Sequence, residues 1–183
     1  MDQKEIETLK KAGKIASQTV TYARSFIKKD MNLLEIAETI ESKILELGAK
    51  PAFPVNLSIN ETAAHATPAH NDEQTAFGLL KVDIGVHLDG LIADTAFSID
   101  LEDLEENKEL IEAAESSLQA ALEEVQKNKE LPLRKIGSTI SDTMKKKGAT
   151  PIINLSGHSI DHYDLHAGIT IPNYDNAQEK TLE

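Results

Sequence analysis

The stretch LKVDIGVHLDGLIADTAFSI, residues 80–99, places two carboxylates inside otherwise apolar sequence. Apolar residues alternate with polar or small ones over residues 81–87, which is the period of a β-strand. The dipeptide Asp89-Gly90 that follows is typical of a two-residue turn between antiparallel strands. The stretch therefore predicts a β-hairpin, and the rest of the chain is read outward from it.

The turn also predicts the register of this hairpin. If Leu88 pairs with Leu91, then Asp83 lies opposite Ala96 and Asp94 lies diagonally across from Asp83. Diagonal neighbours on one face are roughly 7–8 Å apart at the backbone. The two carboxylates therefore share a face and are close enough to hold cations between them.

Small residues, Gly85 and Ala96, should leave the space beside the two acids open. Two carboxylates in a core strand cost several kcal/mol each unless a cation, a proton or a basic partner compensates them. Lys81 is the one basic residue that alternates with them on that face. The alternative is that both acids lie on the solvent side of a half-exposed hairpin.

Composition narrows the class of protein. The 183 residues are enough for one ordinary domain, and the net charge of −12 argues against nucleic acid or an anionic membrane surface as the main partner. There are no cysteines, so a metal would have to be held by histidines and carboxylates. The N-terminus is charged, lacks the apolar core of a signal peptide, and no 18-residue apolar run follows, which predicts a cytoplasmic protein.

Periodicity predicts the other elements. Apolar spacing of three or four residues indicates helices over 3–28, from 32 to 47, after the acidic run 100–106, and from 132 to 147, with Gly48 and Gly148 as the stops of the second and fourth. Residues 55–59 and 151–155 are strand candidates, and 60–75 is predicted to be a loop.

The chain also contains an internal repeat with an offset of 100 residues. Residues 33–51 and 133–151 share seven identities in nineteen positions without a gap. Two helix-helix-strand halves predict a pseudo-symmetric α/β fold, with residues 1–100 as the first half and 101–183 as the start of the second, within a single domain. The counterpart of the hairpin would begin near or beyond residue 183, so we expect the fold to be incomplete at the C-terminus.

Histidines supply further candidates for chemistry. His158, in NLSGHSIDHYDLHAG, follows a predicted strand and is a candidate metal ligand beside Asp83 and Asp94. His65, in ETAAHATP, and His166, in DLHAGI, are candidate acid/base or oxyanion groups because imidazole titrates near neutral pH.

Three stretches carry a specific family resemblance: PAFPVNLSINETAAHATP, LLKVDIGVHLDGLIADTAFSI and NLSGHSIDHYDLHAGITIPNY. They closely resemble the type II methionine aminopeptidases of the archaeal-eukaryotic branch, and the match runs from the first helix to the last residue. The resemblance implies the pseudo-symmetric pita-bread fold and a centre of two divalent metal ions. It implies that Asp83 chelates one ion, Asp94 bridges both and His158 binds the other.

The same resemblance implies roles for four more residues. His65 corresponds to the histidine beside the metal pair, and His166 to the one that contacts the substrate near the scissile carbonyl. Phe53 and Leu165 match positions that line the pocket for the methionine side chain. Two glutamate ligands of the family belong to a later segment, so three of the five ligands are expected in these 183 residues.

The activity implied is metal-dependent removal of the N-terminal methionine from nascent proteins. The ions could be Mn, Fe, Co or Zn, and the substrate a peptide or nascent-protein N-terminus. With three ligands we expect the chain alone to be weak or inactive, and a second chain that carries the missing half to complement it. The alternatives are a Xaa-Pro peptidase of the same fold and a non-catalytic pita-bread protein that binds a partner.

Overall fold

The fold is that of a computed structural model, which describes residues 1–128 and 130–181. The chain forms two compact units: Met1–Leu104 with Asp161–Leu165, and Glu105–Ile160 with His166–Glu183. No helix in the described part of the chain combines the length and the apolar character needed to cross a bilayer.

Two helices open the first unit, and both begin and end where local sequence signals place them. Helix α1 (Gln3–Phe26) starts with a capping box, in which Asp2 Oδ1 accepts a hydrogen bond from the Glu5 amide at 2.8 Å and Glu5 Oε2 accepts one from the Asp2 amide at 2.6 Å. Helix α2 (Leu33–Glu46) is followed by Gly48 at φ +83°, the left-handed stop predicted for it.

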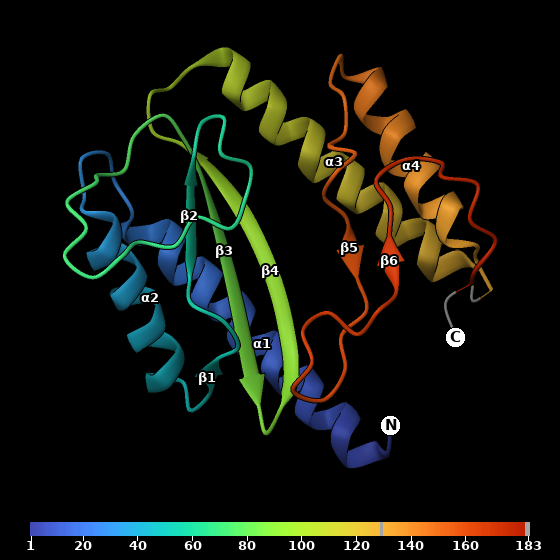
Figure 1. The fold of residues 1–183 in the computed structure, drawn as a ribbon, viewed down its shortest axis with the longest axis horizontal. Helices are drawn as coiled ribbons and strands as arrows, with labels where there is room; N and C mark the ends of the chain where they lie inside the picture. The colour runs from blue at the N-terminus through green and yellow to red at the C-terminus, as the bar shows by residue number, and fades with distance from the viewer. Residues whose placement is uncertain (129, 182–183) are drawn as a thin grey trace. The chain divides into compact units, whose positions relative to one another are not determined.

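An antiparallel sheet follows, with β3 at its centre (Figure 1). Its strands are β1 (Lys50–Pro51), β2 (Asn56–Ile59), β3 (Leu79–Leu88) and β4 (Leu91–Asp100). The predicted register is confirmed, because Asp83 pairs with Ala96 and Gly85 pairs with Asp94. The turn residues have φ +50° and +85°, the positive values that a tight hairpin turn requires.

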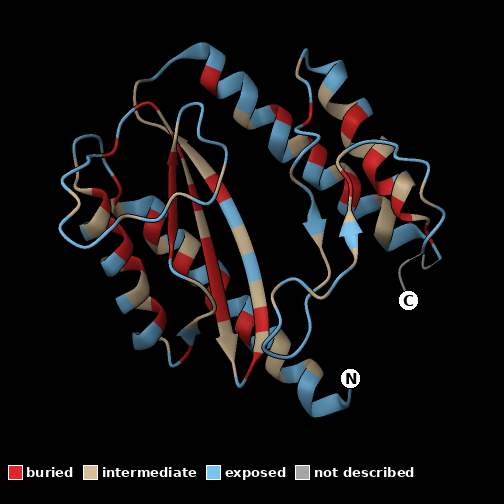
Figure 2. Ribbon diagram, viewed as in Figure 1, coloured by how far each residue is buried: buried red, intermediate tan, exposed pale blue. Residues whose placement is uncertain are grey.

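The two faces of β3 differ in the way its alternation predicts. Val82, Ile84 and Val86 are fully buried in the main apolar core, together with residues of both helices. Figure 2 shows this buried strip along β3. The opposite face of β3 therefore carries Asp83 and is left for the site.

The second unit contains the other half of the repeat. It consists of α3 (Glu105–Lys127), α4 (Leu133–Lys146), β5 (Gly157–His158) and β6 (Thr170–Ile171), with the two short strands paired antiparallel. The bounds of α4 are those of α2 shifted by 100, and Gly148 at φ +76° repeats the stop at Gly48. The sequence repeat is thus a structural repeat.

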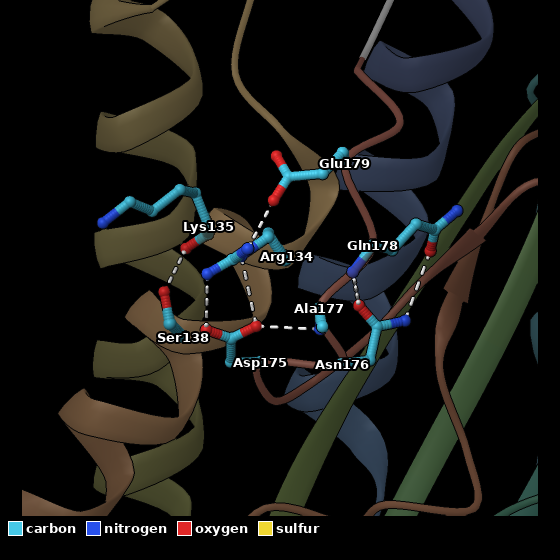
Figure 3. Close-up of polar contacts among 8 residues, drawn as sticks. All are labelled: Arg134, Lys135, Ser138, Asp175, Asn176, Ala177, Gln178 and Glu179. Carbon is cyan, nitrogen blue, oxygen red and sulfur yellow. Dashed lines mark hydrogen bonds and ion pairs between the residues drawn. The ribbon is translucent and has the colours of Figure 1, made fainter.

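The segment before residue 182 lies along α4. A backbone bridge joins Pro132 to Thr181, as Asn32 is joined to Thr75 in the first unit. Figure 3 shows the side chains beside this bridge: Arg134 forms an ion pair with Glu179, and its Nε lies 3.3 Å from Asp175 Oδ1. The segment therefore covers the start of α4, and ion pairs with Arg134 hold it there.

One strand prediction is wrong. Residues 151–155 form no strand, and Ile152 and Ile153 are 44% and 68% exposed. In the first unit the corresponding stretch, from Pro51 onward, lies beside β3, which supplies its hydrogen-bond partners. Among the described residues of the second unit, no hairpin lies beside residues 151–155. An extended segment without a neighbouring strand has no partner for its backbone hydrogen bonds and does not form a strand.

Candidate metal centre

The carboxylates of Asp83 and Asp94 form an electrostatically coupled pair on one face of the hairpin. Asp83 is half-buried and Asp94 is exposed. Burial of the Asp83 carboxyl, followed by repulsion from Asp94, raises the pKa of Asp83 to about 6, although the charge of His65 acts in the opposite direction. A hydrogen bond between the two carboxyl groups also favours the protonated form. The pair thus attracts positive charge near neutral pH.

Lys81, the basic residue on the same face, is directed elsewhere. Its Nζ donates to the backbone carbonyl of Asn60 and, at 3.4 Å, to that of Leu79. Burial lowers the pKa of Lys81 from its usual value. The sequence alone could not distinguish this arrangement from a Lys81–Asp83 pair.

The space above Gly85 is occupied, which corrects the prediction that it would be open. A Cβ built on Gly85 would lie 2.3 Å from Cε1 of Phe53. The ring of Phe53 therefore packs directly on the backbone of β3, at the residue that pairs with Asp94. Because Gly85 has no side chain, the Phe53 ring can pack on the backbone of β3 opposite the strand position of Asp94.

His65 lies in the loop between β2 and β3, in a left-handed conformation at φ +62°. It is exposed, and its charge lowers the pKa of Asp83. The structure thus places four of the predicted site residues in one unit around the hairpin: Phe53, His65, Asp83 and Asp94.

The other two histidines are neighbours in the second unit. His158 is on β5, and its ring centroid lies 4.3 Å from that of His166. The pairing of β5 with β6 and the hydrogen bond from the Ala167 amide to the Ser159 carbonyl, 2.9 Å, bring these residues together across eight positions. The sequence indicated each imidazole separately, but not that the two rings are in contact, tilted by 57° to one another.

Sequence reasoning missed a cluster at the tip of the hairpin. Segment Asp161–Leu165 belongs to the first unit and carries the last predicted site residue, Leu165, which is half-buried. Tyr163 and His162 of this segment contact the turn at Asp89-Gly90. No periodic signal links residues 73 positions apart, so this contact could not be read from the sequence.

The donor set is suited to divalent cations. Two neighbouring carboxylates provide the oxygen ligands that a hard or borderline ion prefers, and imidazoles can complete such a set. Within either unit, the described residues contain no group of three histidine, aspartate or glutamate side chains converging on one point. A groove of about 490 Å³ between α1 and α2, lined by Tyr22, Glu38 and Lys43 among others, contains none of the predicted site residues.

The arrangement of helices, sheet and carboxylates defines a class of protein. Helices cover one face of an antiparallel sheet, paired carboxylates lie on the other, and the helix pair recurs, which is the architecture of the pita-bread metallopeptidases. Residues 7–183 match the profile of metallopeptidase family M24, and the chain belongs to this family.

Sequence relatives and solved structures agree with this assignment. The chain is 49% identical to a methionine aminopeptidase of Pyrococcus abyssi over 171 residues, which cover 92% of this chain and 57% of that protein. It is 46% identical over 181 residues to one of Methanothermus fervidus, covering 92% of this chain and 95% of that protein. The chain thus spans little more than half the length of the first relative and nearly all of the second.

Among solved structures, the methionine aminopeptidase of Thermotoga maritima superimposes with a TM-score of 0.90 at 26% identity, over 100% of this chain and 76% of that chain. The prolidase of Pyrococcus furiosus gives 0.77 at 22% identity, over 100% and 53%. The latter identity shows a shared fold alone. Xaa-Pro peptidase activity therefore has less support than methionine aminopeptidase activity.

Proposed function

We propose that the chain provides metal ligands and substrate contacts of an enzyme that removes the N-terminal methionine from peptides and nascent proteins. The observation that carries this proposal is the coupled pair of Asp83 and Asp94 on one face of the hairpin, with a raised pKa at Asp83. The family match and the names of the archaeal relatives support it. A cytoplasmic location stays a prediction from the sequence.

Asp83, Asp94 and His158 are the residues proposed to hold two divalent ions, drawn from Mn, Fe, Co and Zn. Bound ions of this kind lower the pKa of a water and polarise a carbonyl oxygen. Burial and, secondly, repulsion from Asp94 raise the pKa of Asp83, so a bound cation that compensates the ionised carboxylate suits this residue. His65 favours the ionised, metal-binding form of Asp83 through its charge.

The proposed roles of the remaining residues follow from their chemistry. His166 is proposed to exchange a proton or a hydrogen bond with the substrate near the scissile carbonyl, because imidazole changes charge near neutral pH. Phe53 and Leu165 are proposed to contact the apolar methionine side chain. The position of the Phe53 ring, packed on β3 where Gly85 pairs with Asp94, supports an apolar wall beside the ligands.

Metal binding by the 183-residue chain tests the ligands directly. Calorimetric titration with Mn²⁺ should show an affinity that Asp83→Ala and Asp94→Ala each reduce by at least the roughly 10–100-fold known for supporting residues of metal sites. Asp142→Ala, an exposed carboxylate of α4, is the matched control and should bind as wild type does. Unchanged affinity in the Asp94→Ala variant would contradict the assignment.

Activity is proposed for the chain together with a second polypeptide that supplies the length by which the longer relatives exceed it. Release of methionine from a Met-Ala-Ser peptide should be negligible with the chain alone and should appear when both are present with Mn²⁺ or Co²⁺. Asp94→Ala should abolish it. Robust turnover by the chain alone, or turnover that survives Asp94→Ala, would contradict the proposal.

A further inference from the structure

The segment Asp161–Leu165 contacts the turn of the hairpin that carries Asp83 and Asp94 (Figure 1). The Tyr163 amide donates to the Gly90 carbonyl at 2.9 Å. His162 Nε2 lies 2.6 Å from the Asp89 carbonyl oxygen, which can only accept, so this nitrogen is the donor. Two backbone hydrogen bonds within the segment, between Asp161 and Asp164, close it into a compact loop. We call this arrangement the hairpin clasp.

Side chains reinforce the backbone contacts of the clasp. The Tyr163 ring lies edge-on to His87 of β3, with centroids 5.5 Å apart, and to His162 at 4.7 Å. A Cβ built on Gly90 would lie 2.4 Å from the Tyr163 ring. Gly90 is therefore needed twice, for the turn at φ +85° and for the ring that rests on it.

The clasp is maintained against a conformational cost. Tyr163 has φ +55°, in the left-handed region that an aromatic residue rarely adopts because its Cβ approaches the backbone too closely there. The residue is also 67% exposed, so burial of apolar surface contributes little to holding it there. An exposed, strained aromatic residue suggests a positional role, because such strain is found where function constrains the backbone.

Two proposed substrate-contacting residues follow Tyr163 closely in the chain. Leu165 and His166, proposed to contact the methionine side chain and the scissile carbonyl, come two and three residues later in the chain. The clasp attaches the start of this stretch to the tip of the strands that bear Asp83 and Asp94. We propose that Tyr163 and His162 are positioning residues that orient Leu165, in the same unit, toward the methionine side chain of the substrate. This inference depends on the function proposed above.

The first test needs neither metal nor substrate. Hydrogen exchange of the 183-residue chain, followed by mass spectrometry on peptides spanning 159–166, should show protection of the Tyr163 amide. Tyr163→Ala and Gly90→Ala should speed this exchange at least about tenfold, while Tyr163→Phe, which keeps the ring, should not. Tyr174→Ala, at another exposed tyrosine, is the control and should leave exchange unchanged. Equal exchange in wild type and Tyr163→Ala would overturn the clasp.

The second test separates positioning from folding. With the complementing polypeptide and Mn²⁺, Tyr163→Ala should lose on the order of 10–100-fold in kcat/KM toward Met-Ala-Ser, Tyr163→Phe should restore it, and the Mn²⁺ affinity should stay at the wild-type value. An active wild type with an equally active Tyr163→Ala would overturn the positioning role alone. A wild type that binds Mn²⁺ but is inactive with the complement would overturn the proposed function, and the positioning role with it, whereas the exchange data would still decide whether the clasp forms.

Discussion

Helices α2 and α4 occupy equivalent places in the repeat, yet they are covered to different degrees. Ile36, Ile40 and Ile44 of α2 are all fully buried. On α4, Ile136 is 5% exposed, while Ile140 is only partly buried against a much smaller apolar cluster. The same apolar spacing therefore gives a deep core where a four-stranded sheet lies beside it, and a shallow one where two short strands do.

The first helices of the two halves show the same contrast. Helix α1 packs its small and β-branched residues into the main core. Helix α3 leaves Leu110, Leu118 and Leu122 about half exposed, at 48%, 58% and 48%. Their spacing of eight and four residues puts them on one side of α3. Amphipathic sequence thus specifies a helix and its face, but not whether that face is covered.

The sharpest test of this contrast is the same truncation at matched positions. Ile40→Ala should lower the free energy of unfolding by about 3–4 kcal/mol, because it leaves a cavity in a close-packed core. Ile140→Ala should cost about 1–2 kcal/mol, since a partly exposed site loses less burial and can relax. Urea unfolding, resolved by hydrogen exchange of peptides from α2 and α4, measures both. Equal losses would mean that α4 is covered as fully as α2.

Glycines give a second comparison of the two units. In α4, a Cβ at Gly137 would lie 2.2 Å from the Tyr174 carbonyl oxygen, and backbone cannot move aside cheaply, so Gly137→Ala should destabilise the second unit by about 1–3 kcal/mol. In α1, a Cβ at Gly13 meets nothing within 4 Å, so Gly13→Ala should stabilise by about 0.5–1 kcal/mol through helix propensity. Thermal unfolding of the two variants should therefore shift in opposite directions. A neutral Gly137→Ala would show that the segment after β6 is not held on α4.

Local signals made much of the first unit predictable from sequence. Alternation in β3 and the Asp89-Gly90 turn determine a hairpin register, and the register alone places Asp83 and Asp94 on one face. The repeat likewise predicted α4 and its stop at Gly148. Each of these features depends on residues close together in the chain or on periodicity, which a single sequence displays.

Contacts between distant residues could not be predicted in this way. The Phe53 ring on Gly85, Tyr163 on Gly90 and the Tyr174 carbonyl on Gly137 each fit one side chain or backbone group against a glycine 32 or more residues away. Residues 151–155 have strand-like composition, but no strand lies beside them among residues 1–128 and 130–181, so they lack the hydrogen-bond partners that a strand needs. The metal-ligand roles stay predictions, and the raised pKa of Asp83 supports one of them.

Charge provides the smallest and most specific contrast. Asp175 in the second unit forms an ion pair with Arg134. In the first unit, burial and repulsion from Asp94 raise the pKa of Asp83. An acid with a folded-state pKa of about 6, above its unfolded value of 3.8, contributes stability that is fully present below pH 3.8 and is lost as pH rises through 6. Ionised Asp83 therefore destabilises the metal-free protein at neutral pH relative to a neutral isostere.

Asp83→Asn should accordingly stabilise the metal-free chain by about 1 kcal/mol near pH 7.5, a value reduced from the full pKa shift because the group is partly exposed to solvent. The gain should vanish near about pH 4, where Asp83 is already protonated in the folded protein. Asp175→Asn is the matched control and should give no gain at neutral pH, since it removes a partner of Arg134. Thermal unfolding in chelator across this pH range measures both variants. A gain at Asp83 that persisted at low pH would show that the substitution relieves something other than the charge of the buried carboxylate beside Asp94.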